Sequence, residues 1–349
     1  MNYSGFYRQL PLAIAVAALA SMAVRADRRD GGRVDGFNVV AVAHHPFGSE
    51  TAKVSIAEAK SLGARAISII LFLSQPTPVS PNLTRGPDMP DAELRAAIRN
   101  AHELNLTVLV KPQVFVPKSW AGAIAMTSED DWQQWFANYR NELDRIAHIA
   151  AEEKADALVI GTELSATEQR PEWNIVIDAA RAVFPGRLLY MAHGVEEAES
   201  VPFWGRLDAI GVTLYPRLGP DADRNGRRAE MHVIADRLEA LAVRSGKPIV
   251  VGEIGLRSAT GAAAKPWESA EERPSLPDPA LQADVIADWL AELDRPSIEG
   301  VMIWEWLTNP DAGGLNDTDF TVQGKPAERV LLCAWTEQCA TDWAIVRLP

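Results

Sequence analysis

The segment 248-PIVVGEIGL-256 decides the fold, because it is a short run of β-branched and aliphatic residues that ends in a carboxylate beside a glycine. Seven further runs of similar length and apolar character occur along the chain. They are 37-FNVVAVAHH-45, 66-AISIILFLS-74, 106-LTVLVKPQVFV-116, 157-ALVIGTEL-164, 187-RLLYMAHG-194, 209-AIGVTLYP-216 and 300-GVMIWEWLT-308. Short runs this apolar are typical of parallel strands that are covered on both faces.

Helical patterns separate these runs. In 53-KVSIAEAKSLG-63 the apolar residues recur at helical spacing, and Gly63 supplies a C-terminal stop. Similar segments are 91-DAELRAAIRNAHELN-105, 129-EDDWQQWFANYRNELDRIAHIAAEEK-154 and 280-ALQADVIADWLAELD-294. A strand and a helix repeated eight times predict an α/β fold, a closed (β/α)8 TIM barrel forming a single domain over residues 33–340.

An open, doubly wound sheet is the main alternative fold. It usually carries a glycine-rich fingerprint after its first strand, and 44-HHPFG-48 does not match that pattern. Three connections are long, at residues 75–90, 116–131 and 259–279. Each follows the C-terminal end of an expected strand, so in a barrel all three would surround the catalytic face, unless they are only tolerated surface insertions.

The composition limits the class of partner. The chain has 349 residues, of which 47% are hydrophobic, and a formal net charge of −13. Nucleic-acid binding depends on clustered Lys and Arg, so the charge predicts no nucleic-acid partner. Cys333 and Cys339 lie close together and could form a small-loop disulfide if the protein is exported.

Residues 1–26 have the pattern of a signal peptide. Arg8 precedes an apolar run from Leu10 to about Val24, and small residues follow at plausible cleavage positions. The run is shorter than the roughly 20 residues of a comfortable membrane span, although an uncleaved anchor is an alternative. The sequence predicts a periplasmic or secreted protein without a stable membrane partner.

Two carboxylates end strongly hydrophobic runs. Glu163 closes 158-LVIGTE-163 in the fourth run, and Glu253 closes 249-IVVGE-253 in the seventh. Burying a charge without partners is unfavourable, so either glutamate is a structural ion pair or both are functional. Strands four and seven lie roughly across a barrel mouth. A facing pair of carboxylates in different surroundings suits glycoside hydrolysis, in which one protonates the leaving oxygen and the other attacks the anomeric carbon.

Other polar residues at the strand ends leave alternatives open. His44, His45 and His193 could form a metal site, but adjacent strand residues point to opposite sides, so sugar contact is the preferred role and neither metal nor cofactor is predicted. Glu305 is a rival carboxylate. Strand alternation places it opposite Trp304 and Trp306, and the tryptophan face is expected to line the cleft unless a bulge intervenes.

The motifs resemble those of the clan A retaining β-glycosidases, and within it the β-mannanases of glycoside hydrolase family 113. The matching pieces are KPQ at 111–113, IGTEL at 160–164, VTLYP at 212–216, VVGEIGL at 250–256, MIWEW at 302–306 and GKPAERVL at 324–331. The resemblance implies that Glu163 is the acid/base, Glu253 the nucleophile, Tyr215 the residue that orients it, and Trp304 the platform under the sugar.

Further substrate contacts are expected at Lys111, Gln113, Thr162, His193 and His44. Two positions depart from the pattern of the clan: Thr162 replaces an asparagine, and Gln113 stands where histidine is expected. Thr162 can still hydrogen-bond a hydroxyl, so the departures concern the substrate more than the reaction.

The sequence therefore predicts a monomeric retaining glycoside hydrolase that cleaves a β-1,4-linked polysaccharide or oligosaccharide, foremost β-mannan, by double displacement. For that cycle the pKa of Glu163 is expected to be raised, while Glu253 stays ionised. A clan A enzyme acting on another β-glycan or an exopolysaccharide is one alternative. A non-catalytic carbohydrate-binding protein of the cell envelope is the other.

Overall fold

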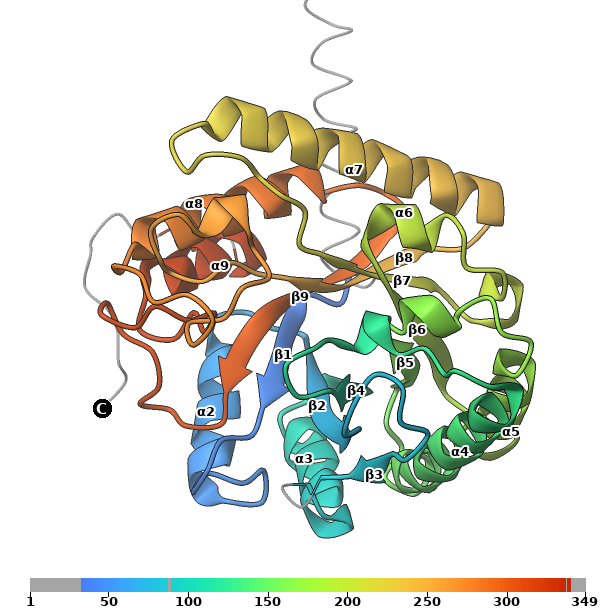
Figure 1. Cartoon of the computed structure of the whole chain (residues 1–349). Coiled ribbons are helices and arrows are strands. Elements are labelled where there is room, and N and C mark those ends of the chain that lie inside the picture. Colours follow the sequence, from blue (N-terminus) through green and yellow to red (C-terminus); the bar gives the residue numbers. More distant parts are fainter. Residues whose placement is uncertain (1–32, 87–88, 337, 340–349) are drawn as a thin grey trace, which may run out of the picture. The chain divides into compact units, whose positions relative to one another are not determined.

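The computed structural model describes residues 33–86, 89–336 and 338–339, so the expected signal peptide lies outside the described residues. In this part of the chain, eight parallel strands form a closed barrel (Figure 1). The strands are β1 (Gly36–Val40), β2 (Ala66–Ser74), β4 (Thr107–Phe115), β5 (Ala157–Thr162), β6 (Arg187–His193), β7 (Ile210–Leu214), β8 (Ile249–Ile254) and β9 (Ile298–Leu307). Because β1 pairs with both β2 and β9, the sheet closes on itself. The predicted TIM barrel is confirmed.

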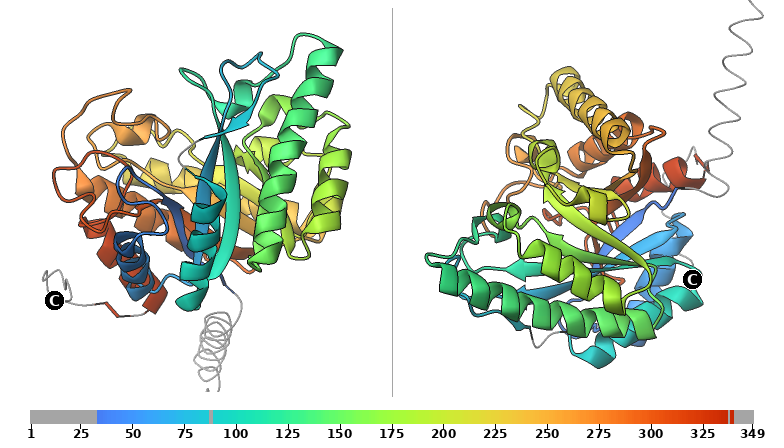
Figure 2. Two further views of the ribbon diagram at one scale, coloured as in Figure 1. Left: turned by 90° about the horizontal axis from the view of Figure 1, so that it is seen from below. Right: turned by 90° about the vertical axis from the view of Figure 1, so that its right-hand side faces the viewer.

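Helices surround the barrel, as the two further views show (Figure 2). They are α2 (Glu50–Ser61), α3 (Asp91–Glu103), α4 (Glu129–Glu152), α5 (Trp173–Val183), α6 (Gly194–Ala198), α7 (Arg224–Ser245), α8 (Pro279–Glu292) and α9 (Pro326–Thr336). Side chains cap several of them: Ser128 accepts a hydrogen bond from the backbone of α4, and Asp278 does so for α8, where Pro279 is the first helical residue. The short strand β3 (Thr84–Arg85) runs antiparallel to the end of β2.

Apolar side chains fill two regions, one between strands and helices and a smaller one inside the barrel. Leu109, Leu189 and Val250 belong to the inner region. Since side chains alternate along a strand, Lys111 and Gln113 of β4 follow Leu109 on the inner face. The inner face is thus apolar low in the barrel and polar toward the C-terminal ends of the strands.

The strand alternation is interrupted at two places that matter for the site. In β8, Val251 pairs with Val212 but Glu253 pairs with Thr213, so one extra residue, Gly252, lies between them. A Cβ at Gly252 would lie 2.4 Å from the sulfur of Met191, so a larger residue there would have to displace that side chain. In β9 the residues Trp304 and Glu305 together face one position of β1.

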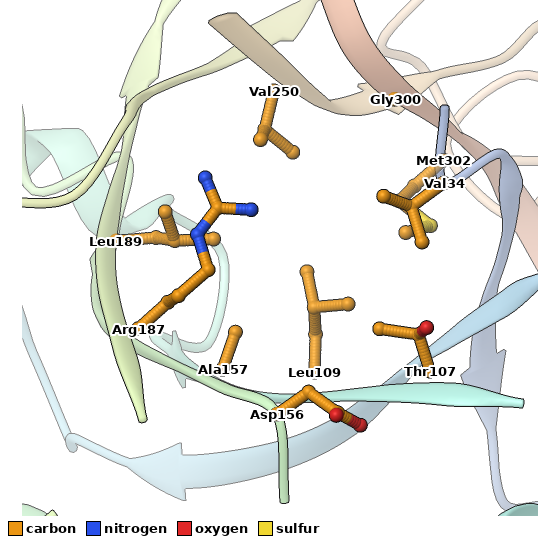
Figure 3. A pocket seen from close by; sticks show the side chains of 10 residues that line it. All are labelled: Val34, Thr107, Leu109, Asp156, Ala157, Arg187, Leu189, Val250, Gly300 and Met302. Atoms are coloured by element: carbon orange, nitrogen blue, oxygen red, sulfur yellow. The ribbon is translucent and has the colours of Figure 1, made fainter. Parts of the chain in front are cut away.

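A small cavity of about 40 Å³ lies at the end of the barrel where the strands begin (Figure 3). Its lining is mostly apolar and includes the first residues of several strands: Thr107, Ala157 and Arg187. Active sites of these barrels lie at the C-terminal ends of the strands, so this cavity belongs to the structural end.

No helix in the described ranges is long and apolar enough to cross a membrane.

The last helix packs against the first strand. The ring of Trp335 in α9 meets Phe37 of β1 edge-on with centroids 5.1 Å apart, and Phe37 also contacts Trp306 of β9 at 4.8 Å. Cys333, within α9, and Cys339, after its end, form a disulfide, the pairing that their spacing allowed.

Candidate active site

The three long connections all leave the C-terminal ends of strands, as predicted. The first carries β3, and the other two each contain a short 3-10 turn, at Ala121–Ala123 and Ala262–Ala264. Glu163 and Tyr215 directly follow β5 and β7, His193 ends β6, and Glu253 lies near the end of β8. The structure therefore brings Glu163, His193, Tyr215 and Glu253 to one end of the barrel.

Glu253 is held by three donors from two other strands. Lys111 and Gln113 of β4 donate to its Oε1, the latter at 2.7 Å, and Tyr215 donates to Oε2 at 2.9 Å. Lys111 is fully buried, and its ammonium also donates to Asn38 Oδ1 at 3.1 Å. Lys111 and Gln113 were expected to contact sugar hydroxyls, whereas here they bind the carboxylate. The expected orienting contact of Tyr215 is present.

Glu163 has a different set of partners. It follows β5 with a positive φ of 54°. Its Oε1 is 3.1 Å from Nδ1 of His193 and also accepts the hydroxyl of Thr213. A nitrogen facing a carboxylate oxygen acts as the donor, so Nδ1 of His193 carries a proton. The ring of Trp120 lies beside His193 with centroids 5.0 Å apart. The two glutamates are thus distinguished by their partners.

The pKa shifts follow from these partners. Burial acts to raise the pKa of Glu163, but the hydrogen bond and charge of His193, with the Thr213 hydroxyl, hold it below its ordinary value. Burial raises the pKa of Glu253, and the Glu163 carboxylate adds to this, against the opposing effect of Lys111. The expectation of a raised pKa at Glu163 is wrong, because His193 and Thr213 stabilise the ionised carboxylate. The carboxylates in turn raise the pKa of His193 against the effect of burial.

The sequence matches the profile of Glycoside Hydrolase Family 113 over residues 37–325. The chain belongs to this family. It is a glycoside hydrolase, and the matched region contains both carboxylates and nearly the whole barrel. A comparison with curated proteins found no match.

Solved structures of family 113 share the fold. The β-mannanase AaManA from Alicyclobacillus acidocaldarius, in complex with ManMIm, superposes with a TM-score of 0.79 at 24% identity, covering 89% of this chain and 99% of that one. A complex of a family 113 β-1,4-mannanase gives a TM-score of 0.78 at 26% identity, covering 87% and 99%. The GH5_18 protein of Streptomyces cattleya is more distant, with a TM-score of 0.58 at 14% identity over 87% of this chain and 80% of that one.

In this family 113 member, the remaining expected contacts are placed differently. Thr162 is buried, and its hydroxyl donates to the carbonyl of Pro112 at 3.3 Å, which counts against the predicted sugar contact. His44 is exposed in a turn after β1, with a positive φ of 68°. Sugar contacts by Thr162 and His44 stay predictions.

The bulge in β9 overturns the expectation that Trp304 and Trp306 both line the cleft. Trp306 is buried against the helices, where its indole N–H donates to Ser55 Oγ at 2.8 Å, so it does not line the cleft with Trp304. Trp304 and Glu305 are both partly exposed, and the peptide bond between them is cis. Lys111 lies 5.8 Å from the centroid of the Trp304 ring, which places that ring beside the partners of Glu253.

Glu305 is therefore a third carboxyl at this end of the barrel. Burial, with the charges of Asp319 and Glu253 adding to it, raises the pKa of Glu305 to about 8.

Within the described ranges, no group of three or more His, Cys, Asp or Glu side chains could hold a metal ion, so His44, His45 and His193 do not form the metal cluster considered from the sequence.

Several residues of the site escaped sequence analysis. Thr213 lies two positions before Tyr215 on β7, and strand alternation from Tyr215 could have found it. Asn38 of β1 donates to the carbonyl of Gly252 at 3.0 Å, which supports the bulge before Glu253. Glu168 and Glu197 lie behind His193, and no sequence signal distinguished them from surface carboxylates.

Proposed function

We propose that this family 113 protein is an endo-acting, retaining β-1,4-mannanase, acting as a monomer, with Glu253 as nucleophile and Glu163 as general acid/base. The observation that carries the assignment is the contrast between the two carboxylates. Glu253 accepts hydrogen bonds from Lys111, Gln113 and Tyr215, which fix its oxygens for attack. Glu163 is bound to His193, a group that can supply and recover a proton.

The first step follows from this arrangement. Glu253 attacks the anomeric carbon while Glu163 donates a proton to the leaving oxygen, so that the glycosidic C–O bond breaks and a covalent glycosyl-enzyme forms. In the second step Glu163 takes a proton from water, whose oxygen displaces Glu253 and restores the free enzyme. Lys111 and Tyr215 hold the departing carboxylate of Glu253 in place.

Proton occupancy sets the expected pH range. Glu253 must be ionised, and because its pKa is raised, activity falls as the pH drops through that value. The Glu163–His193 pair must retain one proton, so activity falls again at high pH as His193 loses it. The pH profile is expected to be bell-shaped.

The substrate assignment is supported by the solved relatives. The 26% identical family 113 structure is described as a β-1,4-mannanase, and its fold covers nearly all of this chain. Trp304 offers an aromatic face of the kind that stacks on a sugar ring, next to the partners of Glu253.

Reducing-sugar release from β-mannan, β-glucan and xylan tests the proposal, with wild type compared with Glu163→Gln and Glu253→Gln. Glu50→Gln serves as control, since its carboxylate is 86% exposed on α2. Release from β-mannan, lost in both site variants and kept in the control, is the expected result. With an activated aryl mannoside as substrate, added azide should restore more turnover to Glu163→Gln, the acid/base variant, than to Glu253→Gln, the nucleophile variant. Activity on another β-glycan would change the substrate, and binding without release would make the protein a carbohydrate-binding module.

We also propose that the chain is exported to the periplasm or secreted, from the signal-peptide pattern of residues 1–26. The Cys333–Cys339 disulfide supports an oxidising compartment. Fractionation of expressing cells, with mass measurement of the mature N-terminus, tests export; an intact chain in the cytosol would contradict it.

A further inference from the structure

Polar groups of β6 hold Glu163 and the next residue from two sides. On the side-chain side, His193 is bonded to the carboxylate. On the backbone side, the N–H of Leu164, the next residue, donates to the hydroxyl of Tyr190 at 3.1 Å. Tyr190 is fully buried on β6, three residues before His193. Both contacts come from the same strand, so β6 fixes the position of Glu163.

Two further carboxyl groups join these contacts into a closed loop. Glu197 of α6 accepts a hydrogen bond from the backbone N–H of His193 at 2.8 Å. Glu168, just after the turn Ser165–Thr167, lies beside Glu197 and Tyr190, and both act on its carboxyl group. The loop therefore runs from Glu163 through His193, Glu197, Glu168 and Tyr190 to Leu164.

The Glu168–Glu197 pair holds one proton. Glu168 is only 2% exposed, and within the described chain no N–H or O–H donates to its Oε1. No Lys or Arg in the described ranges forms an ion pair with either carboxyl. Two adjacent carboxylates without a cation cannot both ionise, so one shares a proton with the other. Burial, with the charge of Glu197 adding to it, raises the pKa of Glu168 to about 10, which makes Glu168 the protonated partner.

The pair therefore carries one negative charge, on Glu197, which is bonded to the backbone of His193. The carboxylates of Glu163, Glu197 and Glu253 all act on the His193 ring, and each favours its protonated form against burial. The Trp120 ring also lies against His193, tilted by 58° with the ring centroids 5.0 Å apart. Glu197 is the one of the three carboxylates that does not take part in the reaction, so it can act on His193 throughout the cycle.

We propose that the Glu168–Glu197 pair is a positioning device that keeps a proton on His193, so that His193 is the proton reserve of the acid/base residue Glu163. This rests on the proposed role of Glu163. The Nδ1 proton of His193 passes to the ionised carboxylate of Glu163, which gives it to the leaving oxygen, so that His193 is left neutral and Glu163 ionised. When Glu163 later takes a proton from water, that proton passes on to Nδ1 of His193 and restores the starting state. Neither Glu168 nor Glu197 changes its protonation state.

The test compares Glu197→Gln and Glu168→Gln with wild type in the full chain, by NMR titration of His193 and by kcat/KM on β-mannan against pH. Glu197→Gln should lower the titration midpoint of His193 and move the high-pH limb of activity down equally, a roughly three- to tenfold loss at a fixed pH on that limb. The loss should appear in kcat more than in KM. In Glu168→Gln the amide still donates to Glu197, so the His193 midpoint should stay at the wild-type value.

Glu196→Gln is the matched control, because Glu196 is the neighbouring residue of α6 and pairs with Arg237. It should shift neither readout. An unchanged His193 midpoint in Glu197→Gln, or an equal shift in Glu196→Gln, would overturn the proposal. In wild type, the side-chain carbon shift of Glu168 should stay at its protonated value from about pH 6 to 8, and an ionised value there would also overturn it. The NMR readouts need no activity, so they remain decisive even if the chain does not cleave β-mannan.

Discussion

Lys111→Met tests whether a buried cation sets the ionisation of Glu253, the proposed nucleophile. Lys111 is fully buried and donates to Oε1 of Glu253, so the variant removes a charge from the interior while keeping an unbranched side chain of similar length. A hydrogen bond to a charged group contributes about 1.5–3 kcal/mol. At about 1.4 kcal/mol per pH unit, its loss should move the low-pH limb of kcat/KM upward by about one to two units. The sign follows because Glu253 must be ionised to attack.

The measurement is kcat/KM on β-mannan from about pH 4 to 8, with folding checked by circular dichroism. At pH 5 the variant should be roughly ten- to a hundredfold less active than wild type, and the gap should narrow as the pH rises. Gln113→Met is the matched control, because Gln113 donates to the same oxygen at 2.7 Å without a charge. Its shift should be about one unit or less. A low-pH limb that is unmoved in Lys111→Met, or moved equally in Gln113→Met, would refute the role of the charge.

Three further variants test neighbouring groups. Because the pKa of Glu168 is raised to about 10, the folded protein keeps a proton that the unfolded chain releases above its ordinary pKa, so stability falls as the pH rises between the two values. Glu168→Gln should thus be more stable than wild type in urea by roughly 3 kcal/mol at pH 7 and equal near pH 4; a pH-independent difference would contradict this. Tyr215→Phe, which loses the bond to Glu253, should lower kcat by about tenfold or more with little change in Tm, and wild-type kcat would remove Tyr215 from the mechanism. Since the pKa of Glu305 is raised to about 8, the activity ratio of Glu305→Gln to wild type should change between pH 7 and 9, and a constant ratio would argue against that ionisation.

The fold was predictable because the strands are short, mostly apolar runs and the segments between them carry apolar residues at helical spacing. The run 66–74 coincides with β2, and 91–105 differs from α3 only at its end. The first run extends beyond β1, since the chain turns after Val40 and His44 adopts a left-handed backbone. Helix α9 was not predicted, although its residues were noted as a motif.

The site was predictable in its residues more than in their contacts. Glu163, Glu253 and Tyr215 meet because strand ends converge, which sequence can foresee. The contact of Lys111 with Glu253 was not foreseen, although a lysine in the middle of a buried strand could have signalled an internal counter-ion. The bulge at Trp304 and Glu305 reverses an orientation derived from alternation, and no local residue pattern predicts where an extra residue enters a strand.

The contact of α9 with β1 also constrains the order in which the protein can be made. Phe37 finds its cover in Trp306 and Trp335, residues translated some 270 and 300 positions later. Until both tryptophans have been synthesised, β1 of the nascent chain has an unpaired edge and the ring of Phe37 is uncovered. A prematurely terminated product lacking α9 would keep Glu163 and Glu253 but leave Phe37 partly uncovered.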